Sequence, residues 1–183
     1  MNIKENDIFN VLKLIKRFIK KNTGSLPINL RKNPFIVHYY NEIIRFWNKL
    51  NFIVKRTLKD FDSLDIEKFP HYLYATYRIL WENASDTTVI KELKVIRKSF
   101  LRRTRSFSWK RNLEGKDEKE KFSICKSVPS FMVDRLLQVM NLEFLAENID
   151  YMNSLVSNIK LSIRINNLIG NYTKEELFRK IGD

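Results

Sequence analysis

The chain has 183 residues, of which 34 are Lys or Arg and 21 are Asp or Glu, so its formal net charge is +13. Because 44% of the residues are hydrophobic and 13% are aromatic, the chain can bury a core, which excludes a wholly disordered protein. A single cysteine, Cys125, excludes a disulfide framework, and with two histidines it supplies too few soft ligands for a zinc centre. No apolar run reaches the roughly 18 residues that a membrane span needs. Together with an N-terminus that lacks a secretory signal, this predicts a basic, soluble, cytoplasmic protein without a membrane partner.

Three helices are expected before residue 82. Apolar residues recur at helical spacing over 8–19, which predicts a first amphipathic helix. Asn33-Pro34 is typical of a cap followed by a first-turn proline, and it predicts a long second helix that runs toward Leu58. The third helix is expected over 71–81. Because it is apolar on nearly all sides, we expect it at the centre of the fold.

The positive charge is concentrated around a fourth predicted helix, which Ser85-Asp86 caps. Between Lys91 and Arg111 there are nine Lys or Arg residues and a single acidic one, Glu92. If the helix continues to Arg105, at about 100° per residue five cations lie opposite its apolar side. We call these five the basic face: Lys91, Lys94, Lys98, Arg102 and Arg105. Such clustering favours a nucleic acid, because cations that neutralise phosphates release counterions. The alternative is a solvated surface that keeps the chain soluble.

Aromatic residues alternate with cations directly after this helix. Phe107 and Trp109 stand between Arg105 and the pair Lys110-Arg111. Segments of this composition can stack bases on their rings while their charges hold phosphates. The alternative is that the two rings pack under the helix and close the first domain. Both interpretations of the rings stay open from the sequence.

The composition changes after residue 112. Residues 113–126 are polar and charge-mixed and contain a glycine, which is typical of a linker. We therefore predict a helical domain over 1–112, this linker, and a small α+β segment over 127–183 with one or few strands. A strand is expected over 159–166, where apolar and polar residues alternate and where Arg164 and Asn166 share one face. The predicted fold class is mainly α.

The second half also carries a family resemblance. Its segments follow in the order Ser127-Val128-Pro129, a helix with Arg135, Leu161-Ser162-Ile163-Arg164-Ile165-Asn166, Glu176-Leu177 and Ile181-Gly182. This order resembles the segment that precedes the catalytic domain in the Sun/Fmu-type RNA cytosine-5 methyltransferases. A NusB-like, all-helical RNA-binding domain often comes first in those proteins. The first half here, with Tyr72-Leu73-Tyr74-Ala75-Thr76-Tyr77-Arg78 in its third helix, is compatible with such a domain.

The resemblance implies that this chain is the RNA-binding N-terminal region of an rRNA or tRNA methyltransferase. It implies S-adenosylmethionine as the cofactor of a downstream catalytic domain in the same polypeptide, and no cofactor in this chain. Arg164 and Asn166 are then expected to contact RNA or to brace the catalytic domain. The chain has no Gly-rich loop after a strand, and Cys125 does not follow a proline, so this chain alone is expected to be non-catalytic.

Two other hypotheses stay open. The first is a stand-alone basic helical module that binds RNA or a protein, as antitermination-type helical domains do. The second is a self-contained enzyme. His38 and His71 have no acidic or nucleophilic partner at a helical spacing, so the sequence predicts no acid–base pair for the second hypothesis.

Overall fold

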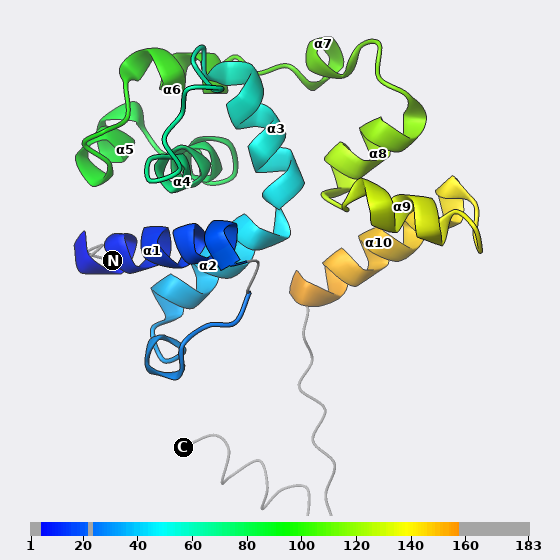
Figure 1. Ribbon diagram of the computed structural model, residues 1–183, viewed down its shortest axis with the longest axis horizontal. Helices are drawn as coiled ribbons and strands as arrows, with labels where there is room; N and C mark the ends of the chain where they lie inside the picture. Colours follow the sequence, from blue (N-terminus) through cyan, green and yellow to red (C-terminus); the bar gives the residue numbers. More distant parts are fainter. Residues whose placement is uncertain (1–4, 22–23, 158–183) are drawn as a thin grey trace, which may run out of the picture. The chain divides into compact units, whose positions relative to one another are not determined.

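The computed structural model of the chain describes residues 5–21 and 24–157 (Figure 1). These residues form ten α-helices and one short 3-10 helix, and no strand is present among them. The mainly α prediction is confirmed for this part of the chain. The strand predicted over 159–166, with Arg164 and Asn166, lies outside the described residues. Among the described helices, none is long and apolar enough to cross a bilayer.

The chain divides into two compact units, Met1–Leu142 and Glu143–Asp183. Helix α10 (Leu142–Ser157) supplies the described part of the second unit, and the other helices belong to the first. Residues 113–126, whose composition is typical of a linker, contain helix α8 (Glu118–Lys126). Glu and Lys are good helix formers, and this helix buries two apolar side chains, Phe122 and Ile124. The domain boundaries derived from composition stay a prediction.

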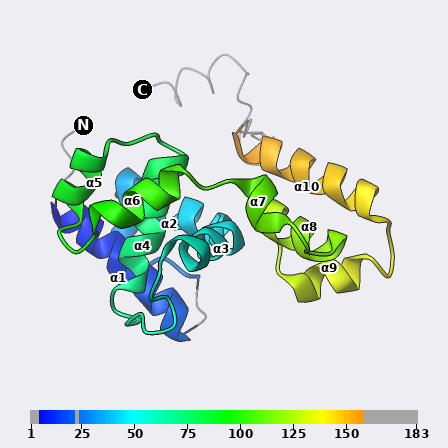
Figure 2. The same cartoon turned by 90° about the horizontal axis from the view of Figure 1, so that it is seen from above.

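Helix α4 (Phe69–Leu80) is the centre of the first unit. Helices α1 (Glu5–Lys21) and α6 (Lys98–Arg105) pack against opposite sides of it (Figures 1 and 2). Four consecutive residues of α4 have no exposed surface: Leu73, Tyr74, Ala75 and Thr76. The predicted central helix is therefore confirmed, and its all-round apolar sequence follows from its being packed on several sides.

The prediction of a single long helix after Asn33 is wrong, because the chain forms two helices there, α2 (Pro34–Arg45) and α3 (Trp47–Thr57). The predicted cap is confirmed: Asn33 Oδ1 accepts a hydrogen bond from the backbone N–H of Phe35 at 3.0 Å. The chain bends at Phe46, whose ring packs on Trp81 with centroids 5.0 Å apart. The bend lets α2 pack on α1 while α3 packs on α6 and α8. Tertiary packing thus overrides a sequence that contains no helix breaker here.

The remaining elements of the first unit are short. They are the 3-10 helix η1 (Ile28–Leu30), α5 (Asp86–Glu92), α7 (Trp109–Leu113) and α9 (Ser130–Leu136). Ser127 joins α8 to α9 in a left-handed conformation with φ of 57°. Its hydroxyl accepts a hydrogen bond from the backbone N–H of Asn48 at 3.1 Å, which ties this connection to α3.

Candidate nucleic-acid interface

The fourth helix does not continue to Arg105, the condition under which five cations would share one face. It ends at Glu92 as α5, and the chain turns over 93–97 before α6 begins. A continuous helix would separate Asp86 from Arg105 by about 28 Å, at 1.5 Å per residue. Instead Arg105 Nε donates to Asp86 Oδ1 at 2.8 Å, so the end of α6 lies beside the start of α5. Both short helices can then pack on α4. The fold-back buries three large apolar side chains: Leu93, Ile96 and Phe100.

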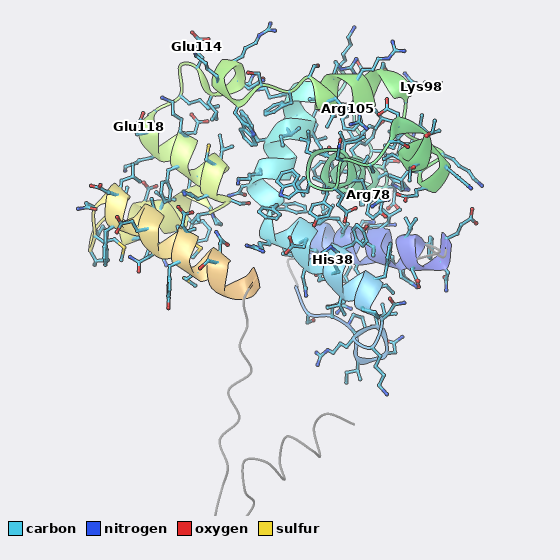
Figure 3. All side chains as sticks on the ribbon, turned by 180° about the vertical axis from the view of Figure 1, so that it is seen from behind. His38, Arg78, Lys98, Arg105, Glu114 and Glu118 are labelled. Carbon is cyan, nitrogen blue, oxygen red and sulfur yellow. The ribbon has the colours of Figure 1, made fainter. Side chains whose placement is uncertain are left out.

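The turn divides the basic face into two kinds of residue. Arg105 is a brace, because its guanidinium also donates to the backbone carbonyl of Ala84 and, at 3.4 Å, to Asn83 Oδ1. The other four cations are exposed, and their side chains have no hydrogen bond or ion pair within the described residues: Lys91, Lys94, Lys98 and Arg102. Lys98 and Arg105 stand at the two ends of α6 (Figure 3). Four cations, rather than the five predicted, are therefore free to hold an anion.

Three aromatic rings meet where α6 is followed by α7. Phe107 packs on Phe52 of α3 with centroids 6.2 Å apart, and it contacts Trp109 edge-on at 5.0 Å. Trp109 is stacked on Phe52 at 6.3 Å with an interplanar angle of 10°. Phe107 is half-buried, whereas 36% of Trp109 remains exposed. The rings do close this end of the unit, and Trp109 still presents a surface to solvent.

A hollow of about 410 Å³ opens beside these rings. Trp81, Phe107 and Trp109 give it aromatic walls, and the half-buried thiol of Cys125 also lines it. Lys110 and Arg111 follow Trp109 in α7 and are exposed. Of the predicted residues of this segment, the two aromatic ones therefore line the hollow, whereas Lys110 and Arg111 do not.

The sequence analysis missed the cations of α3 that border the same rings. Arg56 Cζ lies 5.5 Å from the centroid of Phe52, a distance at which a cation is attracted to the ring face. Lys55 and Lys59 line a second hollow of about 460 Å³ on this side of Phe52. The spacing of residues within one helix cannot reveal that these cations lie near α7, because the contact between α3 and the segment after α6 is tertiary. The run Lys55-Arg56 before Lys59 was the one available signal.

A buried charge network was also missed. Arg78 Nε and Nη2 donate to the two carboxylate oxygens of Glu92 at 3.0 and 2.7 Å, and only 11% and 8% of these side chains are exposed. Arg78 Nη1 also pairs with Glu82 and donates to the Tyr39 hydroxyl at 2.9 Å. The Tyr39 hydroxyl in turn donates to Glu82 Oε2 at 2.9 Å. The only sequence signal was one arginine within an apolar helix, with Glu82 one turn later.

The network joins three helices rather than forming a reaction centre. Burial lowers the pKa of Arg78, but the hydrogen bonds of Glu92 and Glu82 raise it more, so the guanidinium stays charged. Burial raises the pKa of Tyr39 well above its ordinary value, so its hydroxyl stays protonated and can donate. His38 Nε2 lies 3.8 Å from Glu82 Oε1 in the loop after α4, a partner that the spacing within the helix of His38 does not reveal. Arg78 therefore fastens α4 to α2 and α5.

Within the described residues, no group of three or more His, Cys, Asp or Glu side chains is placed to hold a metal ion. Burial lowers the pKa of His71, and its Nδ1 has no hydrogen-bond partner within the same part of the chain.

Comparison with protein-family models, curated proteins and solved structures finds no match.

Proposed function

We propose that this chain binds RNA, with phosphates held along α6 and a base stacked on Trp109. One observation carries the proposal: four cations whose side chains are unpaired within the described residues follow one another from the end of α5 through the turn into α6, and next in the chain comes a three-ring cluster that leaves part of Trp109 exposed. We define the interface by Lys91, Lys94, Lys98, Arg102, Phe107, Trp109, Lys110 and Arg111. Arg105 serves it indirectly, because its bonds to Asp86 and Ala84 hold α6 in place.

The combination of charge and rings favours a single-stranded nucleic acid over other anions. A strand offers a phosphate for each cation and a flat base for each exposed ring, and stacking contributes about 1–3 kcal/mol per base. A solvated surface would not need aromatic walls beside its cations. The choice of RNA over DNA rests on the resemblance of residues 127–183 to the RNA methyltransferases.

The wider proposal is that the chain forms the RNA-binding region of an S-adenosylmethionine-dependent rRNA or tRNA cytosine-5 methyltransferase. In this proposal the helices before residue 113 form the NusB-like domain, and Arg164 and Asn166 belong to the α+β segment that leads to the catalytic domain. The chain itself holds no cofactor and positions RNA for that downstream domain. The alternative proposal is a stand-alone helical RNA-binding or adaptor module of antitermination type.

Charge reversal in the turn before α6 and at the first residue of α6 tests RNA binding directly. In Lys94→Glu/Lys98→Glu, the affinity for a fluorescein-labelled single-stranded RNA should fall about tenfold or more, measured by anisotropy in dilute buffer. The slope of log K against log salt should become shallower by at least about 1.4, because each lost phosphate contact removes about 0.7. Lys13→Glu/Lys21→Glu, which makes the same charge change on α1, is the matched control. Equal losses in both variants, or an unchanged slope, contradict the proposal.

Methyl transfer and the gene sequence distinguish the wider proposals. With labelled S-adenosylmethionine and RNA, this chain alone should transfer no methyl group, and transfer would identify it as a self-contained enzyme instead. A reading frame that continues with a strand, a Gly-rich turn and later a Pro-Cys pair supports the methyltransferase. A stop codon directly after Asp183 favours the stand-alone module.

A further inference from the structure

A second basic surface lies on the opposite side of α4, along the second half of α1. It is a groove of about 530 Å³ between α1 and the segment around η1. We call it the α1 groove. Its rim carries five cations, Lys13, Lys16, Arg17, Lys20 and Lys21. Its floor is aliphatic and is formed by Leu14, Pro27 and Leu30.

Specific hydrogen bonds hold the wall of the groove that η1 supplies. The backbone N–H of Leu30 donates to the carbonyl of Pro27 at 3.0 Å, which closes the 3-10 turn. Arg31 Nε donates to the carbonyl of Leu26 at 3.1 Å. Asn33 Nδ2 donates to Asp7 Oδ1 at 2.9 Å and so ties the end of this segment back to α1. The groove is therefore part of the fold rather than a gap between loosely placed loops.

The cations of the rim form two rows along α1. Lys16 and Lys20 both pair with Glu67, and Lys20 Nζ lies 3.0 Å from Glu67 Oε1. The hydrogen bond from Lys16, followed by that from Lys20, lowers the pKa of the Glu67 carboxyl, so this edge already binds a carboxylate. The second row, spaced four residues apart, has no ion pair or hydrogen bond of its side chains in the described ranges: Lys13, Arg17 and Lys21.

Two large apolar side chains that do not line the groove are exposed on the segments that form it. Phe9 stands one turn before Lys13 in the same row and is 62% exposed, and Ile28 of η1 is 78% exposed. Apolar surface of this kind next to a built groove is typical of an interaction site. No aromatic ring is among the described residues that line the groove, and Phe9, although exposed, is not one of them, so the lining itself offers a nucleobase no stacking platform.

We propose that the α1 groove binds an acidic amphipathic helix of a partner protein. The leucine-type side chains of that helix would lie on Leu14, Pro27 and Leu30. The carboxylates of that helix would pair with Lys13, Arg17 and Lys21. The four-residue spacing of these cations matches acidic residues spaced by four along a facing helix. Docking an apolar helix face into a groove with charges at the rim is a recurrent mode of peptide recognition.

The test uses the full chain and a fluorescein-labelled peptide of about four helical turns, with leucines on one face and glutamates on the other. We expect saturable binding that weakens as salt is raised. Lys13→Glu/Lys21→Glu should weaken it about tenfold or more, whereas Lys94→Glu/Lys98→Glu should leave it unchanged. Ile28→Ser, at an exposed position that does not threaten folding, should weaken it severalfold through the apolar contact alone.

Three results overturn this proposal. One is no binding of the peptide. Another is equal binding of a peptide of the same composition whose glutamates and leucines are scrambled, since that reports charge alone. The third is loss of affinity for a single-stranded RNA in Lys13→Glu/Lys21→Glu, which would make the α1 groove a nucleic-acid site. RNA binding through α6 is measured separately, so its failure leaves this test intact.

Discussion

The two basic surfaces on either side of α4 differ in the apolar groups beside their charges. The cations of α6 and α7 accompany the rings of Phe107 and Trp109, whereas those of α1 border an aliphatic floor. Net charge alone would assign both surfaces to the same polyanion. In our proposals the neighbouring apolar groups distinguish the partners instead, because rings suit flat bases and aliphatic floors suit leucine-type side chains.

Both surfaces contain some cations that are paired with carboxylates of the chain itself and others that are not paired within the described residues. Arg105 on α6, and Lys16 and Lys20 on α1, are committed to carboxylates of the chain itself. Lys98 and Arg102 have no such partner within the described residues. A count of basic residues therefore overestimates what either surface offers to a ligand.

Loss of the buried network should destroy both surfaces together. Arg78→Met leaves the buried carboxylate of Glu92 and the half-buried carboxylate of Glu82 without their cation, and removal of one partner from a buried pair costs about 3–5 kcal/mol. We expect the free energy of unfolding in urea to fall by that amount. RNA binding and peptide binding should be lost together, at urea concentrations near the unfolding midpoint of the variant. A loss below 1 kcal/mol would show that Arg78 does not hold the helices together.

A smaller change should affect the aromatic surface alone. Trp109→Ala removes an exposed stacking platform, so the affinity for single-stranded RNA should fall about tenfold, since stacking contributes about 1–3 kcal/mol per base. Trp109→Phe keeps a ring and should recover most of the loss, and peptide binding to the α1 groove should not change. If the alanine variant binds RNA as tightly as the parent chain, the ring only closes the helical unit.

The smallest effect is expected at the brace. Arg105→Gln breaks a partly exposed ion pair, and such pairs contribute up to about 1 kcal/mol. Thermal or urea unfolding should detect a loss of that size at most. The salt dependence of RNA binding should stay that of the parent chain, because Arg105 is already occupied by Asp86. A shallower salt slope would place Arg105 among the phosphate contacts.

Much of the fold could be predicted from local patterns. The caps at Asn33 and Ser85 and the central apolar helix were predicted, because capping and all-round burial leave local signals. The bends at Phe46 and over 93–97 were not, since no proline or glycine marks them. The four helices that these bends separate, α2, α3, α5 and α6, all pack on α4. The helix within 113–126 was missed because its polar composition is shared by linkers and exposed helices.

The candidate site was predictable where its residues are neighbours in sequence. The run from Lys91 to Arg111 identified the cations and rings in advance. The sequence did not reveal that Arg105 is bound to Asp86, that Phe52 stacks on Trp109, or that η1 lies along α1. Each of these contacts joins segments distant in sequence, and a single sequence carries no pairwise signal for them.

The central claim is that RNA binds through α6 and α7 and that the α1 groove binds something else. The most direct measurement is a salt titration of labelled single-stranded RNA against Lys94→Glu/Lys98→Glu and Lys13→Glu/Lys21→Glu. We predict a shallower slope and weaker binding in the first variant, and parental behaviour in the second. Equal weakening in both variants would mean that the chain attracts RNA by its overall charge, which contradicts the account.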